Sequence, residues 1–425
     1  MRLPSAHGPL DALERLRAPN VDALRFHDLY RKSEYVVETA DGWSLVITRY
    51  QPRRQDFHQP LWMEPLLLVH GFSQNRHAWT SGEFVKNLLF FGIDIHILEL
   101  RGHGKSSIAR QRRRAARRGT PPPEDLDYGW NVDSYFAGDL PAAVAAVKRK
   151  TGRDRIFYCG HSMGGMLGYG YAGENPDDLA GLITIGSAAE LGKGFGLLRF
   201  LCLFEPAVGH FADAVLATYN AEQQARHARA RLRAGLSSLL GRQPRRPIEP
   251  PQQASMPAVP MDRIFRAVDW LLGAAERRSI WAHASRGMRW LSNPSRTEAE
   301  RFRWLLRNGG EREPRAVVSQ FARWIRNEEM KCYRTGYDFK EGYARIAIPT
   351  AIIFGDMDPL ATLDSTQRVY HDAKSEYLLW RPVKGNSHIE LTMGHDIRQI
   401  CYDIKNLIEY ARSHESVSPS LPRVH

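Results

Sequence analysis

Apolar runs and amphipathic stretches alternate along most of this chain of 425 residues. Runs of about four to eight apolar residues predict buried strands, and they fall at 65–69, 155–159, 181–186, 347–354 and 377–383. Patterns with a helical period separate these runs, at 81–91, 133–151, 362–373 and 396–412. Buried strands that alternate with helices predict an α/β fold, in which helices flank both faces of a mostly parallel sheet.

Two further runs, 34–39 and 44–49, lie on either side of Ala40-Asp41-Gly42. Turn-forming residues between two such runs predict a β-hairpin. We expect this hairpin to form an antiparallel edge of the sheet.

The same pattern divides the chain into parts. We expect an N-terminal extension (1–33), the first part of the core (34–190), a mainly helical insertion (191–342), the second part of the core (343–412) and a flexible tail (413–425). Gly192 to Gly196 form a plausible hinge at the start of the insertion, and a Pro-rich loop follows at 242–251. The second half of the insertion contains five tryptophans, Trp270, Trp281, Trp290, Trp304 and Trp324.

The most informative motif is the stretch 160–165, Gly-His-Ser-Met-Gly-Gly. It follows a predicted strand and precedes a predicted helix, which is the context that a nucleophile elbow requires. Such a turn is so sharp that its flanking positions must be nearly free of side chains, hence Gly160 and Gly164. We interpret Ser162 as a nucleophile. The alternative is a tight turn in which Ser162 only caps the helix.

A serine nucleophile needs a base and an acid, and both candidates follow later strands. His388 lies after the strand predicted at 377–383, and Asp356 and Asp358 lie after the one at 347–354. Side chains just past the ends of parallel strands converge at one edge of the sheet. His388 would take the proton from Ser162 while an aspartate fixes its tautomer. His395 competes with His388, although it looks like the entry to the last helix.

The tetrahedral intermediate of such a reaction needs donors for its oxyanion. Gly71, after the strand 65–69, lets the backbone turn so that the amide of Phe72 points at the developing charge, and the amide of Met163 is the second donor. The alternative is an ordinary strand-to-loop turn. A glycine-rich strand exit at 101–106 contains His103, which we interpret as part of the scaffold.

These motifs together resemble the α/β-hydrolase superfamily, on its lipase and esterase side. His-Gly-Phe (70–72), Arg-Gly-His-Gly-x-Ser (101–106), the 160–165 motif and Gly-Asp-x-Asp (355–358) occur in the family's order. The resemblance implies that Ser162 is the nucleophile, Asp358 the acid and His388 the base, with Phe72 and Met163 as oxyanion donors. The run at 386–391 is similar to the segment around the histidine of acid lipases.

The resemblance also assigns the insertion 191–342 to the position of a cap over the active site. Its tryptophans would line an acyl pocket, or else form the core of a small helical domain. The expected activity is hydrolysis of a carboxylic ester of an apolar acyl group through an acyl-enzyme. The alternatives are an acyltransferase with the same triad, and a catalytically silent scaffold that binds a ligand or partner. The mechanism requires no metal or organic cofactor.

The charge of the chain raises the question of further partners. The formal net charge is +12, and six arginines crowd what we expect to be a loop: Arg110, Arg112, Arg113, Arg114, Arg117 and Arg118. A solvated loop is one interpretation, and weak attraction to an anionic membrane surface is the other. No zinc spacing or recognisable nucleic-acid module accompanies these charges, so we expect no nucleic-acid partner.

Composition limits the location of the protein. Hydrophobic residues make up 43% of the chain and charged residues 25%, which is ordinary for a soluble protein. We find no pattern of a signal peptide or transmembrane span, and the four cysteines lack the spacing of a metal site or disulfide framework. We therefore expect a cytoplasmic location, with peripheral membrane association as an option. The oligomeric state stays open.

Overall fold

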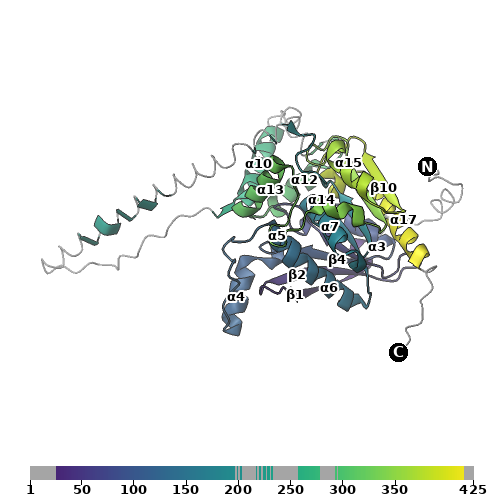
Figure 1. The fold of residues 1–425 in the computed structure, drawn as a ribbon, viewed down its shortest axis with the longest axis horizontal. Coiled ribbons are helices and arrows are strands. Elements are labelled where there is room, and N and C mark those ends of the chain that lie inside the picture. Colours follow the sequence, from purple (N-terminus) through teal and green to yellow (C-terminus); the bar gives the residue numbers. More distant parts are fainter. Residues whose placement is uncertain are drawn as a thin grey trace.

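A central sheet of eight strands organises the molecule (Figure 1). The computed structural model describes residues 25–196, 257–277 and 295–415, together with isolated positions between 199 and 232 and residues 292 and 293. The sheet has the order β1-β2-β4-β3-β5-β6-β9-β10. Its strands are β1 (Tyr30–Glu38), β2 (Ser44–Pro52), β3 (Pro65–Val69), β4 (Asp94–Glu99), β5 (Ile156–His161), β6 (Leu179–Ile185), β9 (Thr350–Gly355) and β10 (Leu378–Val383).

Most of the sheet is parallel, as the sequence predicts. β2 pairs antiparallel with both β1 and β4, and all other neighbours pair parallel. Every residue of β3, β4, β5 and β6 is buried, which explains why these strands appear in the sequence as continuous apolar runs. The predicted hairpin is confirmed, although β1 begins at Tyr30, inside the expected extension.

Helices cover both faces of the sheet. One core contains side chains from α3 (Phe84–Phe90) and α17 (Ile397–Glu415). The core on the other face contains side chains from α6 (Leu140–Thr151), α7 (Met163–Glu174) and α15 (Leu363–Asp372). The four predicted helical patterns are therefore confirmed. Shorter helices are α2 (His77–Thr80), α5 (Val132–Ser134), α14 (Phe339–Gly342) and α16 (Glu390–Met393).

The arginine-rich segment, which we expected to be a loop, is instead helix α4 (Ile108–Arg118). The Ser107 side chain accepts a hydrogen bond from the Arg110 amide at its start, and Gly119 ends it in the left-handed region at φ 63°. Arginine and alanine are strong helix formers, and a serine cap with a following glycine sets the two ends. Figure 1 shows α4 projecting beyond the strands.

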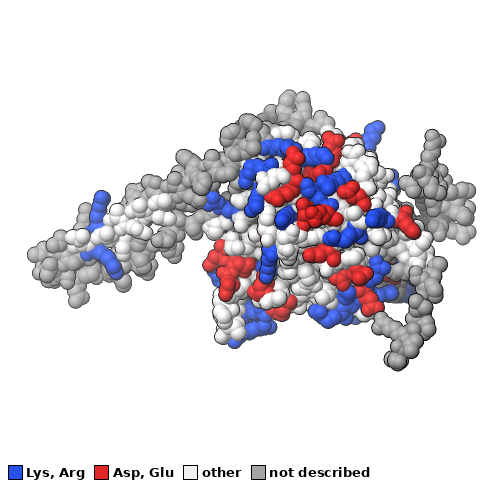
Figure 2. All heavy atoms as spheres, in the orientation of Figure 1, with Lys and Arg blue, Asp and Glu red and all other residues white. Residues whose placement is uncertain are grey.

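Part of the charge of α4 is compensated. Arg112 pairs with Asp127, and Arg114 pairs with Glu38. On the face drawn in Figure 2, basic and acidic side chains are interspersed rather than separated into one basic area.

The described parts of the insertion are mainly helical. They are β7 (Ala258–Val259), α10 (Met261–Arg277), α12 (Ala299–Asn308), β8 (Glu313–Pro314) and α13 (Arg315–Asn327). β7 and β8 form a short antiparallel pair, and the helices gather at one end of the molecule (Figure 1). The limits 191–342 stay a prediction. The Pro-rich loop 242–251 lies outside the described residues.

The tryptophans of the insertion do not share one environment. Trp324 is buried against Phe321 and Phe339, whereas Trp270 and Trp304 are 66% and 38% exposed. Trp281 and Trp290 lie outside the described residues. Trp324 is therefore a core residue, which is the second of the two interpretations of these tryptophans. In the described ranges, we find no helix with the length and apolar content that spanning a bilayer requires.

Candidate active site

Ser162 occupies the single position between strand β5 and helix α7. Its backbone has φ 53° and ψ −121°, a conformation that costs a non-glycine residue on the order of 1–3 kcal/mol. Hydrogen bonds over-determine this turn, because the Ser162 amide donates to Ile185 at 2.9 Å and its carbonyl accepts from Gly165 at 3.0 Å. The Ser162 side chain makes no capping bond to α7. The geometry is the sharp strand-to-helix turn that the sequence predicts, and Ser162 does not act in it as a helix cap.

The glycines around Ser162 are required by close packing. A Cβ on Gly160 would lie 2.3 Å from the carbonyl carbon of Gly164, and one on Gly164 would lie 2.3 Å from the carbonyl oxygen of Val69. A Cβ on Gly71 would lie 2.8 Å from the Cβ of Ser162. The loop after β3 therefore passes directly beside the serine.

Three side chains that are far apart in the sequence form one chain of hydrogen bonds. His388 Nε2 lies 2.9 Å from Ser162 Oγ, and His388 Nδ1 lies 2.7 Å from Asp358 Oδ2. Asp358 and His388 lie on the loops that follow β9 and β10. His388 and Asp358 are both buried. A serine hydroxyl, an imidazole and a carboxylate in this order are the groups that nucleophilic catalysis by serine requires.

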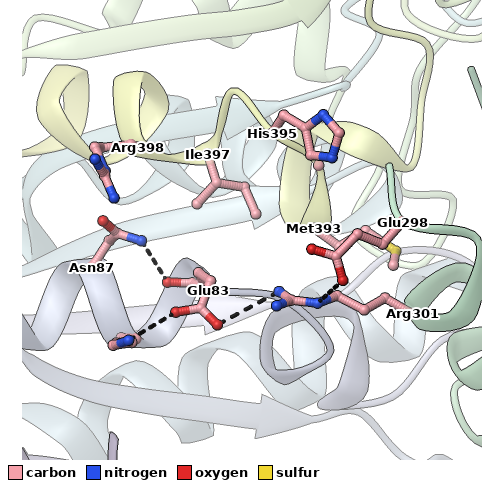
Figure 3. Close-up of a pocket in the computed structure, with 10 residues that line it drawn as sticks. Glu83, Asn87, Glu298, Arg301, Met393, His395, Ile397 and Arg398 are labelled. Atoms are coloured by element: carbon pink, nitrogen blue, oxygen red, sulfur yellow. Dashed lines mark hydrogen bonds and ion pairs between the residues drawn. The ribbon is translucent and has the colours of Figure 1, made fainter. Parts of the chain in front are cut away.

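The competing candidates lie elsewhere. Asp356 Oδ1 accepts a hydrogen bond from the Gly385 amide at 2.7 Å, so it ties together the two loops that carry Asp358 and His388. His395 lines a pocket of about 570 Å³ with Glu83, Arg301 and Arg398 (Figure 3). Arg301 bridges Glu83 and Glu298 there. None of the predicted site residues lines this pocket.

The surroundings of His388 favour a strong base. Burial alone lowers the pKa of His388, but the charge and hydrogen bond of Asp358, with a smaller effect of Glu390, raise that pKa above its ordinary value of 6.5. The second oxygen of Asp358, Oδ1, accepts from the amide of Leu360 at 2.9 Å. Asp358 is therefore held on both sides, which fixes the tautomer and orientation of the imidazole.

Two residues that our sequence reasoning missed support His388. His161 Nε2 lies 3.2 Å from the His388 carbonyl oxygen, and burial together with the His388 charge lowers the pKa of His161 to about 3. His161 is therefore neutral and donates to that carbonyl. Glu390 is fully buried, and neither of its carboxylate oxygens has a hydrogen-bond partner among the described residues. Its position next to a histidine motif was the only signal in the sequence.

The two predicted oxyanion donors flank the serine. Met163 is the first residue of α7, and Phe72 follows Gly71 in the loop that touches Ser162. Within the described ranges, neither backbone amide donates to a protein acceptor. Both amides are available for an oxygen that binds beside Ser162 Oγ. We find no cluster of three or more potential metal ligands in the same part of the chain.

Comparison with known proteins defines the class. A sequence profile described as the alpha/beta hydrolase fold matches residues 64–389, more than half of the chain. The protein therefore belongs to the α/β-hydrolase family, and its central sheet has the mostly parallel architecture of that fold.

Among curated proteins, several lipases are similar to part of the chain. Human lysosomal acid lipase/cholesteryl ester hydrolase is 24% identical over 163 residues, which cover 38% of this chain and 40% of that protein. Human gastric triacylglycerol lipase is 26% identical, over 35% of this chain and 36% of its own length. The chain thus spans about two fifths of the length of the curated relatives that it matches.

Two solved structures are also similar to this chain. A thermophilic esterase from Thermogutta terrifontis has a TM-score of 0.47 at 14% identity, over 90% of this chain and 99% of that chain. A membrane phospholipase A described as a bacterial virulence factor has a TM-score of 0.47 at 16% identity, over 95% and 91%.

Proposed function

We propose that this protein is a serine hydrolase that cleaves carboxylic esters of apolar acyl groups. The observation that carries the proposal is the chain of hydrogen bonds from Ser162 Oγ through His388 to Asp358. Membership of the α/β-hydrolase family and the partial similarity to lipases support an ester as the substrate class.

The reaction follows from the positions of these groups. As Ser162 Oγ attacks the ester carbonyl carbon, His388 Nε2 takes its proton, and the carbonyl oxygen becomes an oxyanion that the amides of Phe72 and Met163 stabilise. The tetrahedral intermediate then expels the alcohol, which takes the proton from His388, and leaves an acyl-enzyme. Water, activated by the same imidazole, attacks the acyl-enzyme and releases the acid and free Ser162. Asp358 stabilises the imidazolium throughout.

The insertion is the natural candidate for setting substrate preference. Its segments β7, α10, α12 and α13 belong to a part of the chain outside the eight-stranded sheet. In our proposal it acts as a cap that supplies the walls of the acyl pocket, since specificity between esters depends on pocket contacts.

An activity-based probe tests the proposal. A fluorophosphonate should label the protein, and Ser162→Ala should abolish the labelling. Ser365→Ala serves as the control, because Ser365 is also a buried serine, and its hydroxyl donates to the Thr362 carbonyl within its own helix turn. A series of p-nitrophenyl esters from short to long then separates esterase from lipase activity.

The same experiment decides between the alternatives. A protein that is labelled and hydrolyses the esters faster than it transfers the acyl group to added alcohols acts as a hydrolase. Preferred transfer would identify an acyltransferase. Absence of labelling would mean a silent scaffold and would overturn the proposal.

A further inference from the structure

Residues of the insertion form hydrogen bonds to the loop that contains the Phe72 amide. Glu313 Oε2 accepts a hydrogen bond from the Ser73 amide at 2.7 Å, although the two residues are 240 positions apart. The amide of Glu311 donates to the Ser73 carbonyl at 2.8 Å. Both polar groups of the Ser73 backbone are therefore held by one short segment of the insertion.

Glu313 is itself held in a buried network. The Tyr135 hydroxyl donates to Glu313 Oε1 at 2.7 Å, and His103 Nε2 lies 3.0 Å from Glu313 Oε2. The other ring nitrogen of His103 faces the Arg101 carbonyl at 2.9 Å. Glu313, His103 and Tyr135 are fully buried, so the carboxylate has little freedom to move.

The contact with Glu313 sets the charge state of His103. Burial lowers the pKa of His103, but the charge and hydrogen bond of Glu313 more than offset it and raise that pKa to about 9. Because both ring nitrogens of His103 face oxygen acceptors, the imidazolium form is satisfied on both sides. At neutral pH His103 is thus an imidazolium, held against the Glu313 side chain.

Ser73 needs such support. Its φ is 51°, in the left-handed region that a non-glycine residue adopts only at an energetic cost. Phe72 lies between Gly71, which touches Ser162, and Ser73. Since the peptide planes on either side of Phe72 share its Cα, a fixed Ser73 amide limits the directions in which the Phe72 N–H can point.

We propose that Glu313 is a positioning residue for the oxyanion hole: through the Ser73 amide, its carboxylate aims the Phe72 N–H at the oxygen that becomes charged. The insertion then contributes to transition-state stabilisation as well as to any acyl pocket. This inference rests on the proposed esterase function. It assigns to Glu313 a role in kcat rather than in substrate binding.

The test is Glu313→Gln, which keeps the size of the side chain but removes the charge and one acceptor. Loss of a whole oxyanion donor lowers kcat by roughly 10²–10³-fold, so a misaimed donor should lower kcat on a p-nitrophenyl ester by about 10- to 100-fold. KM should change less than about threefold. A trifluoromethyl ketone, which forms a tetrahedral adduct with Ser162, should bind more weakly by the factor that kcat/KM loses.

Two further variants make the result decisive. Asp269→Asn breaks an ion pair with Arg303 inside the insertion (2.8 Å). Among the described residues, Asp269 forms no hydrogen bond or ion pair with the Ser73 loop, so this variant should leave kcat unchanged. Tyr135→Phe removes one support of Glu313 while leaving its bond to Ser73, and kcat should fall by roughly two- to tenfold. If thermal melting shows that Glu313→Gln is unfolded, the kcat of Tyr135→Phe becomes the test of the positioning role.

The outcomes separate the two proposals. A folded Glu313→Gln with normal kcat and normal ketone affinity overturns the positioning role alone, as does a loss of kcat that Asp269→Asn reproduces. A wild-type protein that hydrolyses no ester and takes no fluorophosphonate overturns the proposed function and the positioning role with it.

Discussion

Replacing Glu390 by glutamine should make the protein more stable at alkaline pH but not at acid pH. Glu390 is fully buried, and its carboxylate oxygens have no hydrogen-bond partner among the described residues. Burial raises the pKa of this carboxyl from its ordinary 4.5 to about 7, and the backbone amide of Glu390, the nearby Ser292 hydroxyl and His388 oppose the effect only in part. The charged form is therefore the costly one in the folded state.

The size and sign of this stability difference follow from the coupling between proton binding and folding. Between about pH 4.5 and 7, the folded protein keeps a proton that the unfolded chain has released, so the free energy of unfolding falls as pH rises through this window. The difference between the ordinary pKa of 4.5 in the unfolded chain and the pKa of about 7 in the folded protein corresponds to about 3 kcal/mol in the free energy of unfolding. Glutamine resembles the protonated acid and stays neutral. Glu390→Gln should therefore match the wild type near pH 4.5 and exceed it by up to about 3 kcal/mol at pH 8.

Urea unfolding of both proteins at several pH values between 4.5 and 8 measures this difference. The quantity of interest is the change in the difference with pH, because every other titrating group is shared by the two proteins. Activity gives a second readout. Since the Glu390 charge contributes to the raised pKa of His388, the acid limb of the pH–rate profile should move to lower pH in the variant. A difference in unfolding free energy that is the same at pH 5 and pH 8 would refute the reasoning.

Four other predictions test the site and the surface. Asp358→Asn should lower kcat by roughly 10⁴-fold, because the imidazole loses its orienting carboxylate, whereas Asp356→Asn should cost less than about tenfold in the same ester assay, since the Asp356 carboxylate accepts from the Gly385 amide and not from His388. The acid limb of kcat/KM in the wild type should have a midpoint above pH 6.5, because the raised pKa of His388 keeps the base protonated to higher pH. Gly160→Ala should lower the free energy of unfolding by about 3 kcal/mol or more, because its Cβ meets the Gly164 backbone, and a melting curve like that of the wild type would contradict the packing argument. If α4 attracts anionic membranes, replacing Arg113, Arg117 and Arg118, which are exposed and form no ion pair with a described residue, by glutamine should abolish salt-sensitive binding to anionic vesicles, and equal binding to neutral vesicles would count against the idea.

The sheet could be predicted from sequence because its central strands are buried on both faces. Parallel strands such as β3 and β6 have no solvent-facing positions, so each appears as an uninterrupted apolar run. The sharp turn at Ser162 was equally visible, since such turns demand glycine at set positions. α4 was missed because its charged side chains hide the apolar pattern, while its two helix signals, Ser107 and Gly119, lie outside the run of arginines.

The supporting groups of the site could not be predicted in this way, and the reason is physical. The triad candidates follow strand ends, and strand ends of a parallel sheet meet at one edge whatever the details of packing. Glu313 reaches the site through a tertiary contact whose partner, Ser73, imposes no spacing on the sequence. Glu390 lies only two residues after His388, but nothing in the sequence indicates that its carboxylate is buried. A buried carboxylate is also indistinguishable, by residue type alone, from the many solvated ones. Its role depends on burial, and burial is a property of the folded chain: a glutamate that would have little effect on the surface bonds to the Ser73 amide when it is Glu313, and raises the pKa of His388 when it is Glu390.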